Sequence, residues 1–141
     1  MKIENQAFGK VAAFAEKELC SYLSRMGCPA LSFVLRVADL SVYGMAGVAD
    51  PELDDQYLIR VDNEERLIAG NNPRALLLGV YRYLYLIGCR FLRPGRAFEI
   101  VPVKTNLADF YATEAHTASL RHRGVCIEGG ESIDNIADFL D

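Results

Sequence analysis

The sequence has 141 residues, of which 51% are hydrophobic and 24% charged, and its formal net charge is −4. This length and composition are typical of one soluble globular domain with a short extension. The acidic balance argues against a general nucleic-acid-binding protein, which needs a basic surface to neutralise phosphates. No stretch reaches the roughly 20 consecutive apolar residues that span a bilayer. The N-terminal residues do not form a signal peptide, so we expect a cytoplasmic protein without a membrane partner.

The cysteine and histidine residues do not follow a metal-binding pattern. The four cysteines form no C-x-x-C pair, and the two histidines do not lie at zinc-site spacing. In a cytosolic protein we expect free thiols, several of them packed as small apolar side chains. The sequence therefore predicts neither a metal site nor a cofactor. The residues concerned are Cys20, Cys28, Cys89, Cys126, His116 and His122.

The first half of the chain predicts a helix, a strand, a loop and a hairpin in that order. Apolar residues recur at three- and four-residue steps over residues 7–26, which indicates an amphipathic helix. Residues 31–37 alternate with period two, as a half-buried strand does. The loop over 38–55 contains apolar residues and is expected to pack locally. Two alternating segments within 57–69, joined by a polar turn at 62–65, predict a β-hairpin.

A second helix is predicted over residues 73–87, and its two ends carry recognisable signals. Asn72 can cap the helix, Pro73 suits its first turn, and Gly88 suits the position just past its end. The residues between are almost all apolar, so this helix must be covered on most sides. Because Gly79 lowers helix stability, we expect it to allow a close approach to a strand or another helix.

The remainder of the sequence predicts short strands, a linker and the start of a further domain. Short strands are expected at 90–92 and 98–101, which would complete an α+β domain over residues 1–103. That domain is predicted to be a mixed sheet of about four or five strands with two helices packed on it. Residues 104–118 resemble a linker with one possible edge strand. Residues 119–141 predict one strand and most of one helix, which cannot bury their apolar faces alone, so we expect the protein to continue.

One continuous segment carries a resemblance to a known group of enzymes. It reads GNNPRALLLGVYRYLYLIGCRFLRPGRAFEIVP and covers residues 70–102. The segment resembles the N-terminal domains of bacterial α-glucuronidases and the domain that precedes the barrel of β-N-acetylhexosaminidases. The upstream segments AAFAEKELCSYL and YLIRVDNEERLIAG fit the order of elements in those domains. Because only about seven residues precede the first predicted helix, the strand that these domains have there should be missing or very short.

The C-terminal segment LRHRGVCIEGGES, residues 120–132, is similar to the first barrel strand of hexosaminidase-like enzymes. The resemblance implies that Arg123 binds substrate hydroxyl groups, although an ion pair would explain it equally well. Glu128 lies nearer the end of this predicted strand, where carboxylates bind ligands in (β/α)8 barrels, or it caps the following helix. We expect both residues to bind substrate only within a complete barrel. The catalytic carboxylates of these families lie on later strands, so the sequence contains no predicted catalytic residue.

Other polar and aromatic residues have structural interpretations. The acidic pairs Asp54-Asp55 and Glu64-Glu65 fall in a loop and at a hairpin tip, which favours solvated surface. Residues two apart on a helix point about 200° apart, so three alternating tyrosines are not expected to form one sugar-stacking platform. These are Tyr81, Tyr83 and Tyr85.

The predicted function follows from the resemblance. We expect a non-catalytic N-terminal domain of a carbohydrate-active glycoside hydrolase that supports or orients the catalytic barrel. Its partners would be that catalytic domain, the carbohydrate substrate bound by the barrel, and a second copy of the chain if the enzyme is an oligomer. The alternative is a stand-alone carbohydrate-binding or protein-interaction module. A zinc peptidase is disfavoured because the sequence has no H-E-x-x-H helix.

Overall fold

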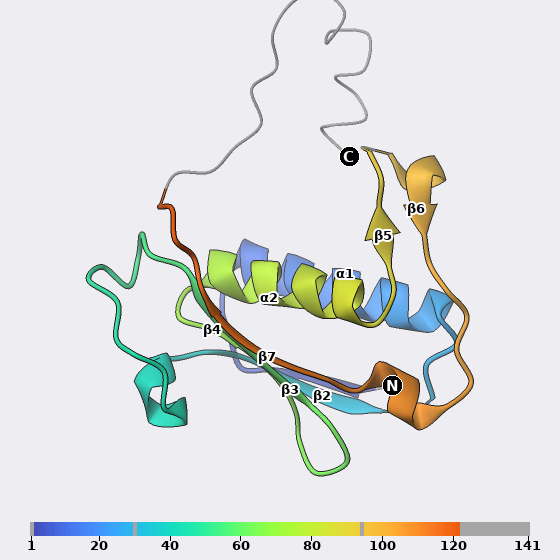
Figure 1. Cartoon of the computed structure of the whole chain (residues 1–141), viewed down its shortest axis with the longest axis horizontal. Helices are drawn as coiled ribbons and strands as arrows, with labels where there is room; N and C mark the ends of the chain where they lie inside the picture. Colours follow the sequence, from blue (N-terminus) through green and yellow to red (C-terminus); the bar gives the residue numbers. More distant parts are fainter. Residues whose placement is uncertain (1, 30, 94, 122–141) are drawn as a thin grey trace, which may run out of the picture.

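The computed structural model describes residues 2–29, 31–93 and 95–121. Within these residues the fold is α+β, with two helices packed on one face of a five-stranded mixed sheet (Figure 1). A separate two-stranded ribbon rises from the helix layer on the side away from the sheet (Figure 1). The prediction of a mixed sheet with two helices packed on it is therefore confirmed. The predicted barrel start lies almost entirely outside the described residues.

The sheet combines parallel and antiparallel pairs in the order β1-β2-β4-β3-β7. β2 pairs in parallel with both β1 and β4, whereas β3 pairs antiparallel with both β4 and β7. Each parallel pair requires a crossover: α1 connects β1 to β2, whereas the chain between β2 and β4 runs through η1 and β3. The strands are β1 (Lys2–Asn5), β2 (Ser32–Val37), β3 (Gln56–Val61), β4 (Arg66–Gly70) and β7 (Ala112–Thr117).

Both predicted helices are present, α1 over Lys10–Arg25 and α2 over Pro73–Leu86. The N-terminus of α2 is built as the sequence predicts. The Asn72 side chain accepts a hydrogen bond of 2.8 Å from the backbone N–H of Ala75, which pairs a donor that the helix leaves unpaired. Gly88 follows the helix with φ of 108°, a conformation that favours glycine.

Gly79 allows α2 to pack closely on the sheet, as the sequence predicts. A Cβ atom at this position would lie 3.1 Å from Cβ of Tyr57 and 3.2 Å from Cγ2 of Ile68. These two residues belong to the adjacent strands β3 and β4. The lost helix propensity is thus offset by close contact between the helix and the sheet.

The main core lies between the helices and the sheet, and a smaller cluster covers the other face of the sheet. The smaller cluster includes Leu40 from the short 3-10 helix η1 (Leu40–Tyr43), so the 38–55 loop packs locally, as expected. The largest fully buried side chains of the main core are Tyr83, Phe33, Phe110, Leu19, Leu23, Met26, Leu35, Ile59, Ile68, Leu76 and Leu84.

The segment predicted as a linker, residues 104–118, contributes directly to this domain. Its 3-10 helix η3 (Leu107–Phe110) places Phe110 in the core, where the Phe110 carbonyl accepts a hydrogen bond of 2.9 Å from the Tyr83 hydroxyl. The possible edge strand is β7, which pairs with the full length of β3. The sheet and core therefore extend beyond residue 103. The strand before the first helix, β1, has four residues.

The two-stranded ribbon consists of β5 (Arg90–Phe91) and β6 (Glu99–Ile100), with the 3-10 helix η2 (Arg96–Phe98) between them. It rises beside the C-terminal end of α2 and over α1 (Figure 1). Among the described residues, neither helix is both long and apolar enough to cross a bilayer.

Candidate functional site

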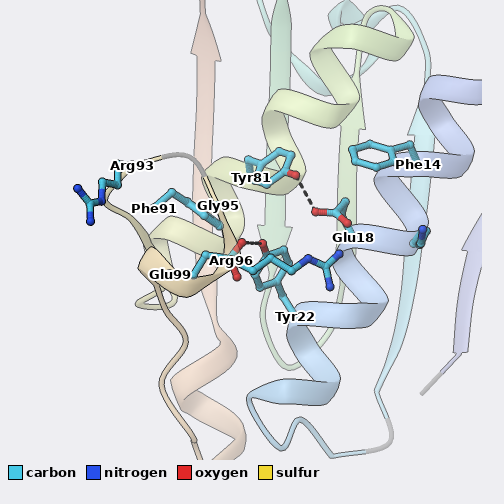
Figure 2. Close-up of a pocket in the computed structure, with 10 residues that line it drawn as sticks. Phe14, Glu18, Tyr22, Tyr81, Phe91, Arg93, Gly95, Arg96 and Glu99 are labelled. Atoms are coloured by element: carbon cyan, nitrogen blue, oxygen red, sulfur yellow. Dashed lines mark hydrogen bonds between the residues drawn. The ribbon is translucent and has the colours of Figure 1, made fainter. Parts of the chain in front are cut away.

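A pocket of about 390 Å³ lies between α1, α2 and the ribbon (Figure 2). Three segments that are far apart in the sequence form it, and both polar and aromatic side chains face it. Its volume is within the range of about 300–1,000 Å³ that is common for small-molecule sites. We call it the ribbon pocket. Its lining residues are Phe14, Lys17, Glu18, Tyr22, Tyr81, Phe91, Arg93, Gly95, Arg96 and Glu99.

Two tyrosine–carboxylate hydrogen bonds organise the ribbon pocket. The Tyr81 hydroxyl donates to Oε2 of Glu18 at 2.7 Å, and the Tyr22 hydroxyl donates to Oε1 of Glu99 at 2.5 Å (Figure 2). Burial, together with these carboxylates, raises the pKa of both tyrosines above the ordinary value. Both phenols are therefore protonated at neutral pH and act as hydrogen-bond donors to the carboxylates.

Glu99 and Glu18 differ in how fully their oxygens are paired. The second oxygen of Glu99 forms an ion pair of 2.7 Å with Nη1 of Arg25. Glu18 is only 6% exposed, and its second oxygen accepts no hydrogen bond from the residues that the structure describes. This oxygen is not fully buried, so water or a ligand in the pocket can donate a hydrogen bond to it.

The pocket is walled by aromatic rings and edged by cations. Phe91 packs edge-on against both Tyr22 and Tyr81, with ring centroids 5.5 Å and 5.4 Å apart. In Figure 2 the Arg96 side chain extends from the ribbon toward α1, whereas Arg93 points away from the pocket. This combination can accept hydrogen bonds from a ligand at its base and contact apolar ligand surface at its walls.

A second depression, also of about 390 Å³, lies on the other side of Tyr81 and Phe91. We call it the aromatic face, because apolar and aromatic groups dominate it. Leu78 and Tyr85 on α2 are 39% and 44% exposed here, which is unusual for neighbouring large apolar side chains. Its lining residues are Asp55, Tyr57, Leu78, Tyr81, Arg82, Tyr85, Phe91, His116 and Ala118.

Glu114 on β7 connects the aromatic face to the sheet. Its carboxylate accepts hydrogen bonds from Nε and Nη2 of Arg82, the shorter at 2.7 Å, and one of 2.7 Å from the Tyr57 hydroxyl. The Arg82 hydrogen bonds, with a smaller contribution from Tyr57, lower the pKa of Glu114 below its ordinary value. Through Glu114, the edge strand β7 contacts α2 as well as β3.

Removing the Glu114 charge should produce a pH-dependent loss of stability. Because its folded pKa is depressed, the contribution is present above the unfolded pKa and is lost as pH falls through the folded pKa. We expect Glu114→Gln to lower the free energy of unfolding by roughly 1–2 kcal/mol at pH 7, with the difference shrinking toward pH 3. Urea denaturation at several pH values measures it. Glu64→Gln, at an exposed turn, serves as the control, and an equal loss at both pH extremes would contradict the prediction.

The two acidic pairs differ in how exposed their side chains are. Glu64 and Glu65 are exposed, as predicted. The prediction of solvated surface is wrong for Asp55, which is only 2% exposed. Its carboxylate accepts two hydrogen bonds from Arg74, at 2.7 and 3.0 Å for Oδ1, and one of 3.0 Å from Asn72 Nδ2. Asp55 is buried because it precedes β3 directly beneath the N-terminus of α2.

The three alternating tyrosines of α2 separate as the helix geometry predicts, but two of them share a side. Tyr83 is fully buried in the core. Tyr81 and Tyr85 are four residues apart and both line the aromatic face. Sequence reasoning compared only residues two apart and therefore missed this pair.

The two sequence-predicted substrate-binding residues, Arg123 and Glu128, lie outside the described residues. The ribbon pocket was missed altogether. One signal was available, since Phe14, Glu18 and Tyr22 recur at four-residue spacing and place a carboxylate on a mostly apolar helix face. Glu99 and Arg96 could not be connected to that face from the sequence.

The thiols and possible metal ligands suggest no other site. Cys20, Cys28 and Cys89 are free cysteines, and Cys126 lies outside the described residues. Burial raises the pKa of Cys28 and Cys89, so neither is primed as a thiolate nucleophile. Within the part of the chain that the structure describes, no three His, Cys, Asp or Glu side chains are grouped so as to hold a metal ion.

Comparisons with known protein families, with curated proteins and with solved structures found no match to this chain. The described residues form an α+β domain with two adjacent surface pockets, the ribbon pocket and the aromatic face.

Proposed function

We propose that this chain is a non-catalytic N-terminal domain of a carbohydrate-active glycoside hydrolase, which supports the catalytic barrel. The resemblance supplies the class of enzyme. The order of elements supports it, because α1, the β3–β4 hairpin and the Asn72-Pro73-Arg74 turn into α2 follow one another as in the domains that the sequence resembles.

The observation that carries the supporting role is the exposed aromatic face. Leu78, Tyr85 and Phe91 are large, apolar and more than a third exposed, and they lie together on one side of the domain. A clustered apolar surface of this kind is typical of a protein–protein or domain–domain interface. Ala118, just after β7, also lines this face. Ala118 therefore brings the chain after β7 to the surface against which a further domain would pack.

The chain itself should lack glycosidase activity, and the native protein should be larger. An immunoblot of source cells with an antibody against residues 2–121 should show a band several times 15.7 kDa, the mass of this chain. A single band near 15.7 kDa would exclude the supporting role and favour a stand-alone module.

Disrupting the aromatic face should separate the domain from its barrel. In the native protein, the double variant Leu78→Glu/Tyr85→Glu should make the linker region more sensitive to limited proteolysis and reduce hydrolysis of aryl glycosides, because two carboxylates cannot be buried in an apolar interface. Val42→Glu, at a more exposed apolar position in η1, is the control for placing a carboxylate on the surface away from this face. If both variants behave like the wild type, the aromatic face is not the interface.

A further inference from the structure

We propose that the ribbon pocket is a saccharide-binding site, in which Glu18 accepts hydrogen bonds from sugar hydroxyl groups and the aromatic wall contacts the sugar ring. This goes beyond the supporting role, which requires no ligand. It concerns a pocket on the other side of Tyr81 and Phe91 from the aromatic face, so the two proposals can fail separately.

The hydrogen-bond pairing of Glu18 is incomplete within the described residues. Its carboxylate is almost fully buried, and the Tyr81 hydroxyl fixes one oxygen at 2.7 Å. The other oxygen accepts no hydrogen bond from the residues that the structure describes, although Glu18 lines the pocket. An acceptor held in place at the pocket selects ligands that bring hydroxyl or amide donors, because a ligand without them would displace water and leave the carboxylate oxygen unpaired.

The walls of the ribbon pocket are aromatic and suit the face of a sugar ring. Phe14 on α1 and Phe91 on β5 are each about two-fifths exposed at the pocket, while Tyr22 and Tyr81 are held in place by their hydrogen bonds. The apolar C–H faces of a pyranose ring can pack on such rings, as amphipathic ligands do on aromatic side chains. A pocket of about 390 Å³ has room for one or two sugar rings.

The edge of the ribbon pocket carries positive charge. Lys17 and Arg96 line it and form no ion pair with the residues that the structure describes, whereas Glu99 is already neutralised by Arg25 at 2.7 Å. The positive charges of Lys17 and Arg96 would repel an organic cation, although the aromatic rings and Glu18 could otherwise bind one. They favour a saccharide that places a carboxylate at the rim while its hydroxyl groups reach Glu18.

The test is a titration of the 141-residue chain, followed by amide NMR shifts, with digalacturonic acid and its uncharged counterpart galactobiose. We expect shift changes confined to residues 14–22 and 91–99, with digalacturonic acid binding more tightly. Glu18→Gln preserves the shape and an acceptor for Tyr81 but replaces the free acceptor by a donor, and it should weaken both ligands about tenfold, which is about 1.4 kcal/mol. Glu64→Gln, at an exposed turn, should bind as the wild type does.

A second variant keeps the test decisive if Glu18→Gln fails to fold. Arg96→Gln lies at the rim, outside the core, and should abolish the preference for digalacturonic acid while leaving galactobiose binding unchanged. Loss of the preference in this variant supports the proposal. Absence of shift changes with both ligands, shifts located elsewhere, or wild-type affinity in folded Glu18→Gln would overturn it. None of these outcomes bears on the Leu78→Glu/Tyr85→Glu experiment.

Discussion

Gly70→Ala should destabilise the protein by about 3 kcal/mol or more, although it adds only one methyl group. Gly70 ends β4 directly beneath the first turn of α2. A Cβ atom there would lie 2.2 Å from the backbone nitrogen of Leu76 and 2.7 Å from the carbonyl carbon of Ala75. Both are backbone atoms, so no side chain can rotate away to relieve the overlap.

The neighbouring structure leaves little freedom for Gly70 to move instead. It pairs with Val37 on β2 and with Tyr57 on β3, and its carbonyl accepts a hydrogen bond of 3.0 Å from the Ala38 N–H. The added atom must therefore displace α2 or break the end of the sheet. The helix that would shift carries Tyr81 and the aromatic face, so both pockets should be distorted in the same variant.

Chemical denaturation of the whole chain, followed by circular dichroism, measures this effect. Gly47→Ala is the matched control, because a Cβ atom at Gly47 would meet no other heavy atom within 4 Å. The free energy of unfolding of that variant should stay within roughly 1 kcal/mol of the wild-type value. It should be slightly higher if the lower conformational entropy of the unfolded chain is the main effect. A Gly70→Ala variant as stable as Gly47→Ala would show that α2 does not rest on β4 as described.

Asp55→Ala should be the second large loss, about 3 kcal/mol, because it removes a buried charge that joins three segments. The Asp55 side chain is only 1% exposed and pairs with Arg74 at 2.7 Å, whereas the Arg74 side chain is half exposed. We place the expected loss at the lower end of values for buried ion pairs because water can solvate Arg74 after the change. Asn72, which caps α2 through the Ala75 N–H, would also lose one of its partners.

The adjacent residue offers a control with the same chemistry. Asp54 forms an ion pair of 2.7 Å with Arg121, and both side chains are partly exposed. Asp54→Asn should therefore cost no more than about 1 kcal/mol. A double-mutant cycle with Asp55→Asn and Arg74→Gln isolates the pair itself. If the Asp54 and Asp55 variants lose equal stability, the Asp55 network does not fasten α2 to the start of β3.

The elements that the sequence predicts well are those specified by neighbouring residues. The amphipathic stripe of α1, the polar turn of the β3–β4 hairpin and the Asn72-Pro73 start of α2 all depend on interactions within a few residues. The role of Gly79 could also be anticipated, because a glycine inside a buried helix has few other uses. These features recur in any fold that contains the segment.

The remaining features depend on contacts between residues that are far apart in the sequence. β7 has weak alternation of its own and becomes a strand because β3 offers an unpaired edge, so that Gln56 pairs with Thr117, 61 positions later. Asp55 is buried only because the start of α2 packs above it. Its position in a polar loop gives no sign of this burial in the sequence. The ribbon pocket depends on Tyr22 meeting Glu99 across 77 positions.

The sequence by itself therefore determined the α+β class, the two helices and the hairpin, since these follow from local periodicity and capping. Only the tertiary structure decided which carboxylates are buried and which aromatic rings share a surface. The physical reason is that burial and hydrogen bonding are set by the segments that pack against a residue, and here those segments come from distant parts of the chain.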